Sequence, residues 1–155
     1  MFFIMLLFLP YEEKYKPILQ QLTLEWLEKY VSVEQEDLDF IHNPKKYALD
    51  KGGHIFVAEY NNEIVGTVSL FRTTDYEFEL GKLALTEKYK GLKFGKQIMQ
   101  LGLDRSRELG AKRIILYTSK RLVAAYNLYL KLGFIEIHQE KQKYIEAKVK
   151  MALDL

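Results

Sequence analysis

The sequence has no cysteine and only three histidines among its 155 residues. Without cysteine there is no disulfide, no thiolate zinc site and no cysteine nucleophile, as is usual for proteins of the reducing cytoplasm. The histidines, His42, His54 and His138, lie far apart and show no metal-ligand spacing. We therefore predict a cytoplasmic protein without a metal site.

The chain also lacks a dominant charge. Its 23 basic and 21 acidic residues give a formal net charge of +2, which argues against a nucleic-acid partner bound through phosphate neutralisation. With 48% hydrophobic residues it can form a proper core. No repeat, low-complexity tract or linker divides it, so residues 1–155 are expected to form a single domain.

The longest apolar run is short. It is the opening MFFIMLLFL of residues 1–9, well below the ~20 residues needed to span a bilayer, and it lacks a basic region before it and a small-residue cleavage site. We predict a buried first strand near residues 3–9 and no membrane partner. A signal anchor, or an upstream start that contributes no structure, is the alternative.

Apolar periodicity predicts alternating helices and strands downstream. Trp26 falls on the apolar face of the first helix, as a core residue would, and Ser119 is placed to cap the last helix. The expected order is a helix over 13–30, helical turns over 36–41 and 45–49, a hairpin of 54–60 and 63–72 around Asn61-Asn62, a strand over 76–85, a helix over 95–109, a strand over 113–117, a helix ending at Leu132, and strands over 134–139 and 147–155.

A Gly-containing loop between the strand at 76–85 and the following helix marks a candidate anion site. It carries Lys88, Lys90, Gly91, Lys93 and Gly95. The first N–H groups of a helix lack internal partners and face the positive end of its dipole, so phosphate oxygens fit there. An ordinary turn with solvated lysines is the alternative interpretation.

Two other nucleotide-binding classes fail on this loop. A P-loop requires Gly-Lys-Ser/Thr, whereas Gly95 is followed by Lys96-Gln97, with no hydroxyl to hold magnesium. A Rossmann dehydrogenase requires a Gly-x-Gly-x-x-Gly run after the first strand, and here the loop follows several strands without that run.

Two motifs resemble those of the GNAT superfamily, the acyl-CoA-dependent N-acetyltransferases. Residues 90–95, KGLKFG, are similar to its pyrophosphate-binding Arg/Gln-x-x-Gly-x-Gly/Ala signature, with Lys90 replacing Arg or Gln and Lys93 replacing the central Gly. Residues 125–134, AYNLYLKLGF, match its Ala-x-x-Leu-Tyr-x-Lys-x-Gly-Phe motif at every defining position. Residues 79–85 and 53–70 resemble its central strands, and Leu122 departs from a frequent Asn.

The resemblance implies an α/β, single-domain GNAT-like fold: a central mixed, mostly antiparallel sheet of six to seven strands, flanked by about four helices. It also implies acetyl-CoA as acyl donor, with the cofactor core at about residues 76–134. Backbone N–H groups where the fourth strand splays from the fifth would hold the pantetheine and polarise the thioester. The implied cofactor-binding residues are Leu83, Ala84, Leu85, Lys90, Gly91, Leu92, Lys93, Phe94, Gly95, Lys96 and Tyr129.

Acetyl transfer to an amine also needs an acid and a base. By its motif position Tyr129 is the implied general acid for the departing thiolate, although periodicity alone would make it a packing residue. Glu79, on the strand that leads to the cleft, is the candidate general base, with Glu77 in reserve and His138 weaker. Glu79 and Glu77 could equally be solvated strand carboxylates.

The predicted function is thus an N-acetyltransferase that acts on a primary amine of a small molecule or peptide, by direct attack in a ternary complex. The resemblance places the acceptor between residues 26–36 and 140–146, where glutamates at 25, 28, 34 and 36 would suit a cation. It also makes a homodimer possible. The alternative function is a non-catalytic acyl-CoA-binding or protein-interaction module on the same fold.

Overall fold

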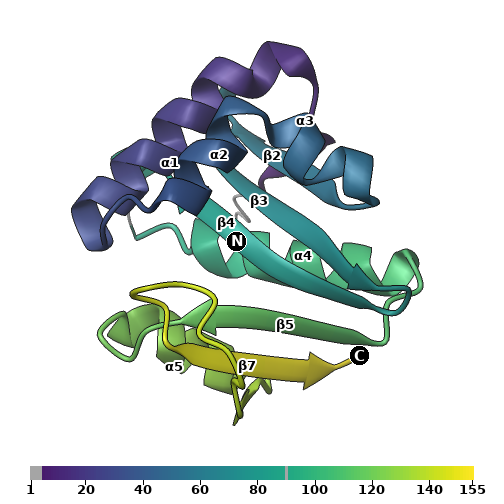
Figure 1. Ribbon diagram of the computed structural model, residues 1–155. Coiled ribbons are helices and arrows are strands. Elements are labelled where there is room, and N and C mark those ends of the chain that lie inside the picture. The colour runs from purple at the N-terminus through teal and green to yellow at the C-terminus, as the bar shows by residue number, and fades with distance from the viewer. Residues whose placement is uncertain (1–4, 90) are drawn as a thin grey trace.

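The computed structural model describes residues 5–89 and 91–155, and these form one seven-stranded sheet with helices on both faces (Figure 1). The strands are β1 (Leu7–Pro10), β2 (His54–Tyr60), β3 (Glu63–Thr74), β4 (Glu77–Leu85), β5 (Arg113–Thr118), β6 (Ile135–Ile137) and β7 (Val149–Asp154). The α-helices are α1 (Lys16–Tyr30), α2 (Gln35–His42), α3 (Pro44–Tyr47), α4 (Phe94–Glu108) and α5 (Val123–Lys131), with 3-10 turns at Glu13–Tyr15, Leu49–Lys51 and Glu87–Tyr89.

The strand order is β1-β2-β3-β4-β5-β7-β6, and only β4 and β5 pair in parallel. The predicted fold class, with a mixed and mostly antiparallel sheet, is confirmed. Within the predicted first strand near 3–9, residues 1–4 lie outside the described part of the chain, and strand pairing covers Leu7–Pro10.

The predicted hairpin forms around Asn61 and Asn62, whose φ angles of 56° and 61° match a turn that tolerates the left-handed region. A bulge interrupts the β2–β3 register next to Ala58, opposite Gly66. A Cβ on Gly66 would come within 2.7 Å of the Ile98 side chain of α4. Glycine at this position therefore lets α4 pack directly on the sheet.

β4 and β5 diverge after a short stretch of parallel pairing. Their parallel pairing covers Glu77 to Glu79 and ends where Glu79 faces Ile115. Beyond that point β4 follows β3 to Leu85, while β5 follows β7 to Thr118. A bulge in β4 at Lys82, with φ 52°, adds to the local bend.

The helices divide between the two faces. In Figure 1, α1 and α2 lie on the viewer's side of β3 and β4, and α4 crosses behind them. The larger apolar cluster joins the sheet to α4 through Leu80, Phe94, Ile98 and Leu103. A second cluster, with Leu19, Phe40, Ile41 and Ile55 among its members, lies under α1 and α2.

Three local predictions are corrected. Trp26 is half-buried at a cleft rather than in the core. Ser119 does not cap α5, whose N-cap is Leu122; the Ser119 hydroxyl accepts a hydrogen bond from the Arg121 N–H in the preceding turn. The predicted strand over 134–139 is shorter, because pairing with β7 covers only Ile135–Ile137.

Candidate active site

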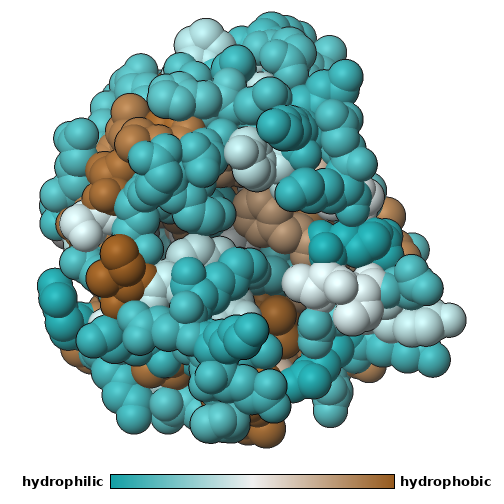
Figure 2. Space-filling model, viewed as in Figure 1, coloured by the Kyte–Doolittle hydropathy of each residue, from teal (hydrophilic) through white to brown (hydrophobic). Residues whose placement is uncertain are grey.

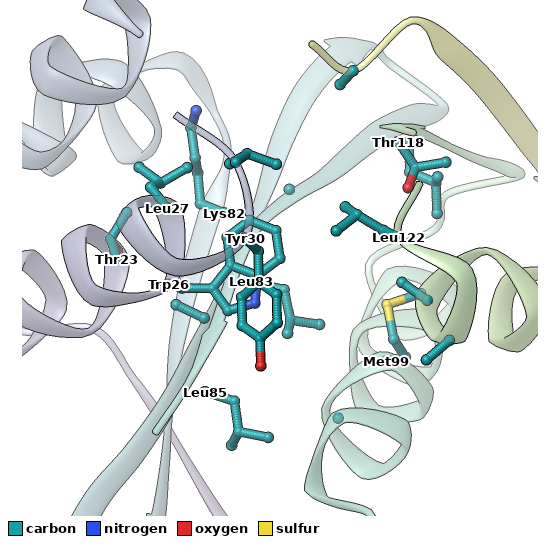
Figure 3. Close-up of a pocket in the computed structure, with 18 of the residues that line it drawn as sticks. Thr23, Trp26, Leu27, Tyr30, Lys82, Leu83, Leu85, Met99, Thr118 and Leu122 are labelled. Atoms are coloured by element: carbon teal, nitrogen blue, oxygen red, sulfur yellow. The ribbon is translucent and has the colours of Figure 1, made fainter. Parts of the chain in front are cut away.

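The divergence of β4 from β5 opens a cleft of about 550 Å³. Figure 3 shows it from the side: α1 contributes Trp26 and Tyr30 to one wall, and Met99 and Leu122 stand on the opposite wall. The bend of β4 lies between the two walls. The space-filling view shows the same face as mostly hydrophilic, with a hollow between the helical part around α1 and the part built on β5 and β7 (Figure 2).

One end of the cleft is closed by the loop that precedes α4. Gly91, Lys93, Phe94, Gly95 and Lys96 line it. Among the predicted cofactor residues here, Lys90 lies outside the described residues, and Leu92 packs against the apolar core rather than lining the cleft.

Lys93 is the N-cap of α4, yet its side chain makes no capping hydrogen bond. The first N–H groups of α4 therefore lack a side-chain acceptor from their own cap, as an anion site requires. A Cβ on Gly91 or Gly95 would meet nothing within 4 Å, so the space before these residues is open. Lys93 adopts a left-handed conformation, with φ 59° and ψ 30°, which glycine reaches at lower cost.

The predicted carbonyl-binding segment forms the floor of the cleft. Leu83, Ala84 and Leu85 all line it, beyond the point where pairing with β5 ends. Leu85 and Ala84 face Gly66 and Thr67 of β3. The β5-facing edge of this segment thus meets the cleft instead of a neighbouring strand.

Tyr129 of α5 also lines the cleft, as predicted from its motif. Its ring packs edge-on against Phe134, with the centroids 6.0 Å apart. Burial raises the pKa of its phenol to about 12. The hydroxyl therefore stays protonated at neutral pH, as a proton donor must.

Glu79 lies in the cleft wall with only 2% of its surface exposed. Its Oε2 accepts a hydrogen bond of 2.7 Å from the Tyr144 hydroxyl, and its Oε1 pairs with the Lys143 ammonium. Burial and the adjacent Glu79 charge raise the pKa of Tyr144. The other two candidates for the general base, Glu77 and His138, do not line the cleft. Glu77 instead accepts a hydrogen bond from the Thr73 hydroxyl.

A second buried ion pair holds α2 against β4. Lys82 Nζ lies 2.6 Å from Asp37 Oδ1 and also pairs with Glu36. Burial by itself lowers the pKa of the Lys82 ammonium, but the two carboxylates outweigh it and the pKa is raised. The ammonium also lies 5.4 Å from the centroid of the Tyr144 ring.

The segments predicted to bind the acceptor do meet at the cleft. Tyr30, Ser32 and Glu34 line it from the region of α1 and α2, and Tyr144 and Glu146 line it from the connection between β6 and β7. The other glutamates predicted to suit a cation, at 25, 28 and 36, do not line it.

Sequence reasoning missed Lys82, Thr118 and Tyr144. An aromatic residue inside the polar segment 140–146 was the available signal for Tyr144, whereas nothing in the local sequence singles out the other two. Thr118 is 3% exposed, lines the cleft at the end of β5 and has no partner for its hydroxyl among the described residues. Figure 3 shows that hydroxyl on the cleft wall above Leu122.

Within residues 5–89 and 91–155, no helix has the length and apolar character needed to cross a membrane. The same part of the chain contains no group of three or more histidine, aspartate or glutamate side chains placed to hold a metal ion.

Comparisons with known proteins agree in matching this chain to acetyltransferases. A family model described as "Acetyltransferase (GNAT) family" matches residues 18–134. The chain is 31% identical over 98 residues to "Probable N-acetyltransferase camello" of Xenopus tropicalis, covering 62% of this chain and 45% of that protein. It is 28% identical over 119 residues to "Uncharacterized N-acetyltransferase YvbK" of Bacillus subtilis, covering 75% and 76%. The chain thus spans less than half the length of the Xenopus relative.

Solved structures share the fold over nearly the whole chain. An acetyltransferase of the GNAT family from Staphylococcus aureus superposes with a TM-score of 0.85 at 23% identity, covering 97% of this chain and 99% of that one. The spermidine N-acetyltransferase of Vibrio cholerae, in complex with CoA and spermine, gives a TM-score of 0.73 at 17% identity, with coverage of 96% and 95%.

Proposed function

This chain belongs to the acetyltransferase (GNAT) family, and from that membership we propose that it transfers an acetyl group from acetyl-CoA to a primary amine by direct attack in a ternary complex. The family and the acyltransferase class predicted from the two motifs are confirmed. The observation that carries the proposal is the end of β4–β5 pairing at Glu79, which opens a cleft between the α4 N-terminus and the acceptor segments.

The residues of the donor end fit acetyl-CoA. Open space before Gly91 and Gly95, the uncapped N-terminus of α4 and the cations of Lys93 and Lys96 suit a pyrophosphate. The free edge of β4 and the Thr118 hydroxyl, for which the described part of the chain offers no partner, suit the amides of pantetheine. Related structures from Bacillus subtilis and Vibrio cholerae hold CoA, which supports the same assignment here.

When bound, acetyl-CoA supplies an activated acyl group as a thioester. Backbone N–H groups of residues 83–85 are proposed to hold and polarise its carbonyl, a role that mobile water could not fill as well because these donors are fixed in advance. Tyr129 is proposed to donate a proton to the departing thiolate. Because burial raises the pKa of this phenol to about 12, above that of a thiol at ~8.5, the proposed contribution is a hydrogen bond that stabilises the developing thiolate even where proton transfer is incomplete.

Glu79 remains the proposed base, but its surroundings define how it reaches the substrate. Lys143 and Tyr144 occupy both carboxylate oxygens, and the side chain is almost fully buried. Tyr144 lines the cleft and its hydroxyl donates a hydrogen bond to Glu79, so we propose that this hydroxyl accepts the amine proton while passing its own proton to Glu79. A cytoplasmic location, a homodimer and the lack of a nucleic-acid partner remain predictions.

Isothermal titration with acetyl-CoA tests the donor site, with ATP as control ligand. Gly95→Trp should abolish micromolar binding, because its side chain would fill open space in front of the loop. Gln100→Trp is the matched control, since Gln100 is exposed on the same helix outside the cleft.

Turnover is tested by measuring acetylation of a panel of amines by the wild type and by Tyr129→Phe. A folded protein that binds no acetyl-CoA would favour the alternative of an interaction module.

A further inference from the structure

The acceptor end of the cleft contains several carboxylates, and nearly all of them are already neutralised or hydrogen-bonded within the protein. Asp37 pairs with Lys82, and Glu79 pairs with Lys143. Glu34 accepts hydrogen bonds from the backbone N–H groups of Ile145 and Glu146. These groups hold the walls together and have little capacity left for a ligand.

Glu146 is the exception. Its Oε1 accepts a hydrogen bond of 3.0 Å from the Ser32 hydroxyl. Glu146 lines the same cleft, and its Oε2 is buried without a hydrogen-bond partner among the described residues, none of whose cations pairs with it. A desolvated carboxylate oxygen without a partner is costly, so this position favours a cationic donor supplied by a ligand.

The facing wall offers features of the same kind. Thr23, Trp26 and Tyr30 follow one face of α1 and line the cleft, as Figure 3 shows. The Thr23 hydroxyl is buried and has no partner within residues 5–89 and 91–155, and the residue is only 3% exposed. The Trp26 and Tyr30 rings lie 5.4 Å apart, and aromatic faces attract cations.

We propose that Glu146 binds a second cationic group of the acceptor, and that the acceptor is a primary amine carrying another protonated amino group. This inference rests on the proposed acetyl transfer. The attacking amine must be neutral when it reacts, whereas a carboxylate favours the protonated form of a bound amine. The group held at Glu146 is therefore not the nucleophile, which reacts at residues 83–85 with Glu79 and Tyr144 as its proton acceptors.

Acetylation kinetics with matched amines test the proposal. 1,4-Diaminobutane and 1-aminopentane have the same number of heavy atoms and differ only in the terminal ammonium, and pairs one to three carbons longer extend the series. The wild-type kcat/KM should be about 10- to 100-fold higher for the best diamine than for its monoamine, as expected for a charge-assisted contact.

Glu146→Gln removes the charge and keeps an oxygen for Ser32. It should bring the ratio close to one by lowering the diamine rate far more than the monoamine rate. Glu140→Gln is the matched control, because Glu140 is exposed in the same connection and does not line the cleft. Equal wild-type rates for both amines, or a ratio that survives in Glu146→Gln, would overturn the inference and leave the acetyltransferase proposal standing.

A binding measurement separates failure of the inference from failure of the proposed function. If no amine is turned over, 1,4-diaminobutane and 1-aminopentane are titrated into the protein in the presence of CoA. Diamine binding that Glu146→Gln abolishes would support the site even then, while absence of any preference for the diamine would refute it.

Discussion

Glu34 Oε1 accepts a hydrogen bond of 2.9 Å from the backbone N–H of Ile145, a residue far away in the sequence. Glu34 is also the N-cap of α2, where it forms a capping box with Asp37. One carboxylate thus organises the start of α2 and fastens the connection between β6 and β7 beside it. Both walls of the acceptor end depend on this side chain.

Glu34→Ala should lower the free energy of unfolding by about 1–2 kcal/mol, the usual cost of losing a helix cap. The KM for the acceptor should rise, whereas the Kd for acetyl-CoA should not change, because Glu34 is remote from the α4 loop. Urea denaturation and calorimetry measure the two effects. Glu28→Ala, an exposed change on α1, should alter neither; equal effects of the two variants would refute a specific role of Glu34.

Lys82→Met should destabilise the protein by about 3 kcal/mol, because the buried Asp37 carboxylate loses its cation. Combining it with Asp37→Asn should recover much of this loss, since Asn keeps an oxygen for the Glu34 N–H that Asp37 binds. Chemical denaturation of the wild type, the two single variants and the double variant gives the interaction free energy between Lys82 and Asp37. Additive losses would show that Lys82 and Asp37 have no interaction energy with each other.

The same pair makes a pH prediction. The folded-state pKa of Lys82 is raised, so its contribution is fully present below the unfolded value of ~10.4 and is lost as pH rises through the folded value. The stability difference between wild type and Lys82→Met should therefore stay constant between about pH 7 and 9 and shrink above ~10.4. Denaturation at a series of pH values tests this, and a difference that shrinks already below pH 9 would contradict it.

Tyr129→Phe should lower kcat by about 100-fold if the phenol is the general acid. Acetyl-CoA affinity should change little, because the ring still packs on Phe134. With a pKa of about 12, Tyr129 should cause no decline of kcat up to pH 10. Tyr126→Phe controls for loss of a hydroxyl from the same helix, where Tyr126 binds Glu136 outside the cleft. Full activity of Tyr129→Phe would assign Tyr129 to packing.

Lys93→Gly should raise the free energy of unfolding by about 0.5–1 kcal/mol, because glycine adopts the left-handed conformation of this N-cap without strain. Lys93→Ala is the matched variant: it removes the same charge and keeps the Cβ. Thermal and urea unfolding should give Lys93→Gly a free energy of unfolding about 1 kcal/mol higher than that of Lys93→Ala. Equal stability would mean that the loop relaxes in the free protein.

The sequence predicted best those features that are set by residues close together in the chain. The hairpin at Asn61-Asn62, the helix after Gly95 and the position of Tyr129 followed from turn chemistry, periodicity and one motif. Predictions that depended on neighbours from distant segments were weaker. Trp26 matched the apolar face of a helix, but part of that face meets the cleft instead of the core. Ser119 had the right residue type for a cap, although the helix begins later.

What the sequence by itself determined is the family and the order of strands and helices along the chain, and it also supplied the proposal of a backbone site for a phosphate-bearing acyl donor, because these are written in contiguous residues. The tertiary structure decided the rest. It brought Lys143 and Tyr144 onto Glu79 and Lys82 onto Asp37, and it left one oxygen of Glu146 without a partner among the residues that the structure describes. Such pairings join residues far apart in the chain, and their charges acquire a role only when folding excludes water from them.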